Sequence, residues 1–309
     1  MAQSKCYRLV TRSDFDGLVC AVLLKHVGLI DEVHFAHPKD MQDGAVEIGP
    51  TDITTNLPYV EGVYLAFDHH RSEVLRVGRQ DNHVIDERAP SAARVVYDYF
   101  GADRFPAAWN EMMEAVDQGD SAQYSVEDII APKRWALLNY IMDARTGLGR
   151  FRDFRVSNYQ LMMMLIDYCR DHGIDEILAL PDVKERTDLY FEHGELAKEQ
   201  ILRCATMHGN LVVLDLRREK TIYSCNRFMI YALFPRCNIS MHVIWGLRRQ
   251  NTVFAIGKSI LNRSSRTNIG ELCLIYGGGG HANAGTCQID NEAADIVRDG
   301  LISRITADG

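Results

Sequence analysis

The stretch CYRLVTRSDFDGLVCAVLLKHV, residues 6–27, decides the fold class of this chain. Residues 6–10 are apolar enough for a short buried strand. A polar loop, Thr11–Gly17, follows, and apolar residues then recur with the period of a helix from about Leu18 to Val27. A strand, a loop and a helix in this order are typical of a parallel α/β sheet, in which ligands bind at the carboxyl ends of the strands.

The pattern of alternating strands and helices continues outward from this stretch. The sequence predicts strands at 34–37, 46–48 and 62–67, and helices at 90–100, 106–116, 126–130, 135–144, 157–172 and 181–207. After residue 209 it predicts strands at 211–216, 241–246, 252–257 and 284–289, with helices at 268–276 and 291–305. A chain of 309 residues favours two domains. We expect domains at 1–180 and 209–309, joined by a linking helix at 181–208.

The charge of the chain is unevenly distributed. The whole sequence has 34 basic and 42 acidic residues, a net charge of −8, which alone argues against a phosphate-rich partner. Residues 209–287, however, hold ten basic residues and three acidic ones, so this segment carries +7 and the remainder −15. Such an asymmetry indicates an anionic ligand bound by the second domain, although a basic face without function is the alternative.

Composition excludes several classes of protein. With 47% hydrophobic and 25% charged residues, the chain is neither disordered nor fibrous. It has no run of about 18 apolar residues that would span a bilayer, and its first residues do not resemble a secretory signal. Its eight cysteines form no CxxC pair. We therefore expect reduced thiols in a cytoplasmic protein with no membrane partner.

Acidic residues and histidines follow three of the predicted strands. Asp14 and Asp16 lie in the first loop, where two carboxylates at i and i+2 can reach two neighbouring cations, although an N-cap aspartate in a turn is the alternative. Asp52 follows the strand predicted at 46–48. The triplet 68–70, Asp-His-His, ends another strand and combines the oxygen and imidazole ligands that suit Mn²⁺, Fe²⁺ or Zn²⁺.

Two further motifs lie later in the chain. Asp117 and Asp120 come near the end of a predicted helix. Residues 276–281 read Tyr-Gly-Gly-Gly-Gly-His, and four consecutive glycines allow the backbone to approach an anion closely. A flexible hairpin is the alternative for the glycines, but the following His281 and the nearby Arg263 favour an anion site.

Taken in order, these motifs resemble the DHH phosphoesterase superfamily over nearly the whole chain. The resemblance is to the branch in which a DHH domain precedes a DHH-associated C-terminal domain, a branch that includes oligoribonucleases, phosphoadenosine phosphatases, dinucleotide phosphodiesterases and exopolyphosphatase-like proteins. It implies an α/β fold with a parallel-sheet N-terminal domain, a smaller α/β C-terminal domain, and an active site in the cleft between them. It also implies a hydrolase that contains one or two metal ions, usually Mn²⁺, with other divalent metals compatible.

The resemblance also implies roles for individual residues. The metal ligands would be Asp14, Asp16, Asp52 as a bridge, His69 and Asp117, with Asp120 as the alternative to Asp117. Asp68 would orient a ligating histidine, and His70 would face the substrate phosphate. The substrate would be bound by Asn262, Arg263, Gly278, Gly279, Gly280 and His281, and by Arg12.

The expected substrate is a small phosphorylated molecule, either a nucleotide or a short oligonucleotide, bound by a protein that could form homodimers as relatives do. Inorganic polyphosphate or pyrophosphate is an alternative substrate, since no obvious base-stacking aromatic lies beside the glycines. A protein that binds nucleotide or phosphate without turnover is another alternative.

One departure from the family pattern motivates that last alternative. The family has His or Asp a few residues before its first carboxylate, whereas this chain has Arg12, which stays protonated and cannot ligate a metal. Three interpretations remain open at this point. His34 or His37 could substitute as a ligand, the first metal could be weak or absent with Arg12 as a phosphate-binding charge, or catalysis could be lost.

Overall fold

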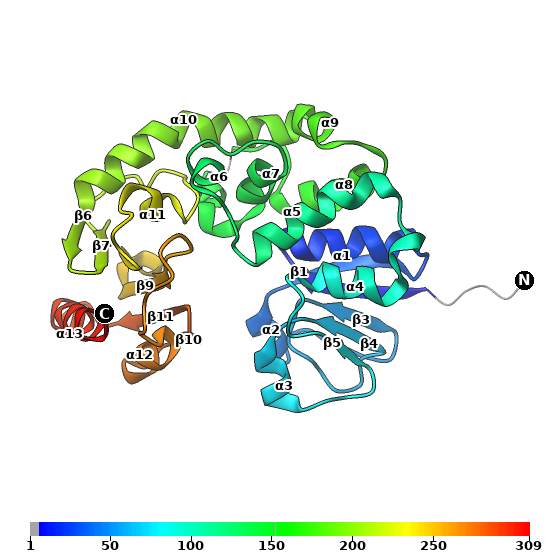
Figure 1. Ribbon diagram of the computed structural model, residues 1–309, viewed down its shortest axis with the longest axis horizontal. Helices are drawn as coiled ribbons and strands as arrows, with labels where there is room; N and C mark the ends of the chain where they lie inside the picture. Colours follow the sequence, from blue (N-terminus) through cyan, green and yellow to red (C-terminus); the bar gives the residue numbers. More distant parts are fainter. Residues whose placement is uncertain (1–5, 152) are drawn as a thin grey trace, which may run out of the picture. The chain divides into compact units, whose positions relative to one another are not determined.

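The computed structural model describes residues 6–151 and 153–309 (Figure 1). The chain divides into two compact units. The first comprises Met1–Gln123 and Pro132–Asp188, and the second comprises Tyr124–Ala131 and Leu189–Gly309. No helix among the described residues is long and apolar enough to cross a membrane.

The first unit contains a parallel sheet with the strand order β2-β1-β3-β4-β5. Its strands are β1 (Tyr7–Arg12), β2 (Ile30–Ala36), β3 (Asp52–Thr55), β4 (Leu65–Asp68) and β5 (His83–Ile85). Because all five strands run in the same direction, their carboxyl ends lie along one edge of the sheet. This edge is where the α/β fold places its ligands.

Helix α1 (Phe15–His26) forms the centre of the first unit. Every residue from Phe15 to Leu24 is buried, as expected for a helix that is apolar on all sides. It packs against α4 (Ala92–Phe100), which lies beside it in Figure 1, and also against α5 (Asn110–Asp120) and α8 (Asn158–Asp171). The other helices of this unit are α2 (Pro38–Gln42), α3 (Arg71–Val77), α7 (Arg134–Met142) and α9 (Ile174–Ala179).

The second unit is built on a six-stranded mixed sheet with the order β10-β11-β9-β8-β7-β6. Its strands are β6 (Ala205–His208), β7 (Leu211–Asp215), β8 (Ile239–Trp245), β9 (Thr252–Lys258), β10 (Gly279–His281) and β11 (Ala284–Ile289). Its helices are α6 (Val126–Ile130), α11 (Met229–Leu233), α12 (Ile269–Ile275) and α13 (Ala294–Asp308). The core residues Met241, Phe254, Ile269 and Leu301 join the sheet to α12 and α13.

Two predicted elements differ from the structure. The long helix α10 (Pro181–Cys204) ends before Met207, because residues 205–208 form β6 and pair with β7. Residues 46–48 form no strand. Val46 and Ile48 instead pack against a small apolar cluster of Val10, Ala36, Met41 and Leu57. The strand of this region is β3, which begins only at Asp52.

The domain boundaries are also more complex than the three consecutive segments expected from the sequence. Helix α6 lies in the first half of the chain but belongs to the second unit. There Asn226 Nδ2 donates to the backbone oxygen of Ile129 at 2.8 Å, and Tyr124 contacts the ring of Phe228. Helix α10 is divided between the two units after Asp188.

His242 of β8 should make the second unit sensitive to acid. Its register neighbours on the two adjacent strands, Leu214 and Ala255, are both uncharged. Burial lowers the pKa of His242 from 6.5 to about 4. Since the unfolded chain binds the proton more readily, stability is complete above pH 6.5 and is lost as the pH falls through about 4.

The test compares wild type with His242→Gln in urea unfolding between pH 7 and pH 4. Over this range the wild type should lose up to about 3 kcal/mol more of its free energy of unfolding than the variant. Parallel pH curves for the two proteins would show that His242 titrates normally.

Candidate metal centre

The ends of two parallel strands bring acidic and imidazole side chains to the carboxyl edge of the first sheet. Asp14 and Asp16 follow β1, and Asp68 is the last residue of β4, directly before His69 and His70. Two groups of three side chains could each hold a metal ion, because the three ligand atoms within each group lie within 4.8 Å of one another. These groups are Asp16, His69 and Asp120, and Asp68, His69 and His70.

The group of Asp16, His69 and Asp120 has the donor set of a divalent metal site. His69 Nε2 lies 3.0 Å from Asp120 Oδ2 but makes no well-aligned hydrogen bond within the described ranges. Two ligand atoms of one cation would approach each other in this way. Two carboxylates and one imidazole suit a cation such as Mn²⁺, Fe²⁺ or Zn²⁺.

Backbone groups hold these side chains in place. The carboxylate of Asp16 accepts hydrogen bonds from the backbone N–H groups of Ala92 and Ala93, at 3.0 and 2.8 Å, at the start of α4. His69 Nδ1 lies 3.1 Å from the backbone oxygen of Ala89 and donates to it. This bond places the proton on Nδ1, and Nε2 is then the ring atom available to a metal.

The electrostatics of this group favour a bound cation. Burial and the neighbouring carboxylates of Asp120 and Asp14 raise the pKa of Asp16 well above its usual value. Burial alone would lower the pKa of His69, but Asp120 and Asp16 outweigh it and raise that pKa to about 9. Burial would raise the pKa of Asp120, yet the contact with His69 lowers it. A divalent cation would relieve this concentration of buried negative charge, so the residues present fit a metal ion.

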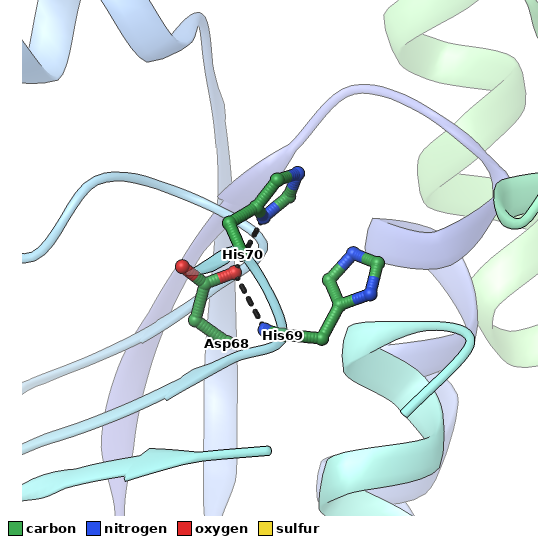
Figure 2. Close-up of side chains that lie close together, drawn as sticks. All are labelled: Asp68, His69 and His70. Atoms are coloured by element: carbon green, nitrogen blue, oxygen red, sulfur yellow. Dashed lines mark hydrogen bonds and ion pairs between the residues drawn. The ribbon is translucent and has the colours of Figure 1, made fainter. Parts of the chain in front are cut away.

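Asp68 and His70 form a second feature at this edge, shown in Figure 2. Asp68 is buried, and its Oδ1 accepts from the backbone N–H of His69 at 2.8 Å and from His70 Nδ1 at 2.7 Å. His70 remains 42% exposed. Asp68 therefore orients His70 directly, whereas the sequence interpretation assigned it to a ligating histidine. The exposed Nε2 of His70 is available to a ligand.

Asp117, predicted as a metal ligand, does not lie in the cluster. It accepts from Ser91 Oγ at 2.7 Å and from two nitrogens of Arg94, and it thereby joins α5 to the first turn of α4. Asp120, almost one helical turn further along α5, takes the predicted place beside His69. Asp117 therefore lies outside both candidate metal groups of the described residues, and Asp120 is the candidate ligand beside His69.

Asp52, predicted to bridge two metals, lies outside both candidate metal groups of the described residues. This residue begins β3 opposite Arg8, at the amino edge of the sheet. Its carboxylate accepts from Arg8 Nε at 2.8 Å and from the backbone N–H of Gly49 at 2.8 Å. Each residue of a strand advances the chain by about 3.3 Å, so Asp52 lies roughly 13 Å from the level of Arg12.

Asn56 is the residue that the sequence interpretation missed. It follows β3 at the carboxyl edge, is buried, and donates from Nδ2 to Asp14 Oδ1 at 3.2 Å. A strand predicted at residues 52–55, in place of 46–48, would have put Asn56 at the carboxyl end of that strand and so indicated it as a site residue.

The glycine run of the second unit forms a β-hairpin. In β10, Gly279 pairs with Thr286 and His281 with Ala284. A Cβ at Gly278 would lie 2.2 Å from the backbone oxygen of Thr286, and Gly277 has a φ of +73°, so folding itself requires these two glycines. Gly279 is different because a Cβ there would meet nothing within 4 Å.

The remaining predicted substrate-binding residues lie in the loop after β9. Arg263 Nε donates to the backbone oxygen of Ile260 at 3.1 Å, and Asn262 Oδ1 accepts from Ser264 Oγ at 2.7 Å. Both residues are solvent-accessible.

Comparison with known proteins identifies the family. No family model and no curated protein matches the chain. Among solved structures, it is similar to the pGpG-specific phosphodiesterase PggH from Vibrio cholerae, with 62% sequence identity and a TM-score of 0.88, over 98% of this chain and 100% of that one. The chain belongs to the DHH phosphoesterase superfamily.

Two distant structures share the fold. RecJ from Thermus thermophilus, solved with Mn²⁺, matches with 14% identity and a TM-score of 0.51, over 99% of this chain and 52% of that one. CDC45 from Entamoeba histolytica matches with 10% identity and a TM-score of 0.51, over 98% of this chain and 95% of that one. The predicted α/β fold and the predicted hydrolase of the DHH superfamily are confirmed.

Arg12 stands where the family pattern has His or Asp, and the structure shows its position. Arg12 ends β1, and its Nε lies 2.9 Å from Asp14 Oδ2. His34 pairs with Val10 inside the sheet, and His37 caps α2 by accepting from the backbone N–H of Lys39 at 3.1 Å. Neither histidine belongs to a candidate metal group in the described part of the chain.

Proposed function

We propose that this chain hydrolyses the phosphodiester bond of the linear dinucleotide pGpG. Water would attack the central phosphorus, the bond to the 3′ oxygen would break, and two molecules of GMP would leave. The observation that carries the proposal is the 62% identity to PggH, which extends over 98% of this chain and 100% of that one.

In this proposal Asp16, His69 and Asp120 hold a divalent cation, and Mn²⁺ is the proposed ion. The support is the donor set and its buried, mutually repelling carboxylates. When bound, the cation would stabilise the negative charge that develops on the phosphate.

The residues of the chain have distinct tasks around that phosphate. Asp68 fixes the Nδ1 proton of His70, and the exposed Nε2 would then contact a phosphate oxygen or the leaving oxygen. The N–H groups of Ala92 and Ala93 hold Asp16 in one orientation, and Ala89 does the same for His69. Preorganised groups of this kind need not rearrange during the reaction.

We also propose that the basic segment 209–287 of the second unit binds the phosphates of the dinucleotide. Its residues for this task would be Asn262, Arg263, Gly278, Gly279, Gly280 and His281. The support is the net charge of +7 over residues 209–287 and the exposure of β10, an edge strand with no side chain at Gly279.

The cysteines from Cys20 to Cys287 are free thiols, which supports a protein that works in the reducing cytoplasm.

Gly279→Ala should weaken substrate binding without weakening the fold. The added methyl group meets no protein atom within 4 Å, but it would stand between the backbone and a phosphate. We expect an unchanged melting temperature and a KM for pGpG raised about tenfold, a loss of about 1.4 kcal/mol. Gly278→Ala is the contrast, because its methyl group would overlap the backbone of β11 and should lower the melting temperature. An unaltered KM in Gly279→Ala would remove Gly279 from the binding site.

Chromatography of the products tests the proposed function. The full chain, loaded with Mn²⁺, is incubated separately with pGpG, pApA and polyphosphate. The expected result is GMP as the sole product from pGpG, with much slower turnover of the other two. Metal-loaded protein that leaves pGpG intact would refute the proposal, and faster release of phosphate from polyphosphate would favour the alternative substrate.

A further inference from the structure

The carboxylate of Asp14 is already occupied by protein donors. Its Oδ1 accepts from the backbone N–H of Gly17 at 3.0 Å and from Asn56 Nδ2 at 3.2 Å, and its Oδ2 faces Arg12 Nε at 2.9 Å. Asp14 thereby caps the N-terminus of α1. It belongs to neither group of candidate metal ligands in the described ranges.

Asn56 is built into this arrangement. It is 2% exposed, and its backbone N–H donates to the oxygen of Phe67 at 3.1 Å across the neighbouring strand. Its φ of 53° lies in the left-handed region, which asparagine tolerates better than most residues. An amide here contributes a neutral oxygen and a donor that faces Asp14, whereas a carboxylate would add a negative charge beside Asp14.

The two neighbouring groups of side chains therefore differ in charge. A metal can bind His69 only through an unprotonated Nε2, and with that neutral ring Asp16, His69 and Asp120 carry −2, which a divalent cation neutralises. Arg12, Asp14 and Asn56 together carry zero, because the guanidinium of Arg12 is always protonated and offers no lone pair to a metal. Arg12 ends β1 at the carboxyl edge of the sheet, where Asp16 also lies, so its positive charge acts at the same edge as the metal group.

We propose that this chain binds a single catalytic divalent cation, held by Asp16, His69 and Asp120, and that the guanidinium of Arg12 supplies the other positive charge at the substrate phosphate. The role of Arg12 toward substrate rests on the proposed phosphodiesterase function. The side chain of Arg12 is 36% exposed, and its contact to Asp14 uses Nε, which leaves the two terminal nitrogens for a phosphate. Arginine binds phosphate through such a pair of N–H groups.

The number of bound ions tests the first half of this inference without substrate. Isothermal titration and elemental analysis of the full chain after dialysis against Mn²⁺ should give one tightly bound ion. Its electron paramagnetic resonance spectrum should be that of an isolated Mn²⁺. The double variant Arg12→His with Asn56→Asp supplies an imidazole and a carboxylate beside Asp14, and it should bind two ions whose spectra show magnetic coupling. Arg79→His, an exposed change of the same kind, should keep one ion. Two tight ions in the wild type would overturn the inference.

Kinetics tests the second half. Arg12→Met should raise the KM for pGpG by at least about tenfold while the bound-metal count stays at one. Arg12→Lys, which keeps the charge but loses the paired N–H groups, should recover part of that loss. An unchanged KM and kcat in Arg12→Met would overturn the role of Arg12. Two tight ions in the wild type, or unchanged kinetics in Arg12→Met, would overturn this inference alone. The proposed function would fail in a different way, if the wild type with one bound ion left pGpG intact.

Discussion

Replacing Asp120 with asparagine is expected to lower the affinity for Mn²⁺ by at least about a hundredfold and kcat on pGpG by about a thousandfold. The reason is that Asp120 is one of only two carboxylates in the group that contains His69 Nε2, 3.0 Å away. An amide in its place leaves that group with a single negative charge. Titration with Mn²⁺ and turnover of pGpG, both on the full chain, measure the two effects.

Asp117→Asn is the matched control for this change. The two aspartates lie on the same helix, three residues apart, but Asp117 binds Ser91 and Arg94 and lies outside the metal group. We expect the control to retain Mn²⁺ affinity within about threefold and to lose about 1–3 kcal/mol of stability, because Arg94 loses a charged partner. The opposite pattern, with metal lost from Asp117→Asn and kept by Asp120→Asn, would refute the assignment.

His70→Ala is expected to lower kcat by about 10² to 10⁴ while the metal remains bound. His70 presents Nε2 to solvent beside the metal group, and its Nδ1 is held by Asp68 at 2.7 Å. A side chain that donates or accepts a proton in the reaction acts on kcat, whereas a metal ligand would also change the ion count. Elemental analysis of the variant separates these two roles.

Asp68→Asn should have a smaller effect on kcat than His70→Ala and serves as the comparison. It keeps the shape of the side chain but weakens the hold on the His70 ring, so its kcat should fall less than that of His70→Ala. His34→Ala changes a histidine of β2 outside both candidate metal groups and should leave kcat close to that of the wild type. If His70→Ala hydrolyses pGpG at the wild-type rate, His70 takes no part in the chemistry.

The parts of this site that are local in sequence could be predicted without a structure. The strand, loop and buried helix of residues 7–26 follow from hydrophobic periodicity, and they place Asp14 and Asp16 together at a strand end. The triplet Asp68–His70 ends β4 for the same reason. The glycine run forms a hairpin, and its predicted role as an anion site stays a prediction.

The errors arose where the position of a residue depends on the start of an element. A strand assigned to 46–48 made Asp52 its carboxyl end, whereas β3 begins at Asp52 and ends before Asn56. A shift of one strand length moves a residue from one edge of a parallel sheet to the other. The choice between Asp117 and Asp120 as the metal ligand also depends on distant residues. The partners of Asp117 lie 23 and 26 residues away in the sequence, at the start of α4.

Short-range periodicity and motif spacing encode the superfamily, the α/β class, and the residues that lie within a few positions of a strand end. Long-range packing places Asp120 with Asp16 and His69, pairs Asp52 with Arg8, and brings Asn56 beside Asp14. These contacts join residues far apart in the chain, and they depend on which strands become neighbours and where each one starts. Hydrophobic patterns indicate that a strand is buried, but strand order and register follow from packing of the whole sheet.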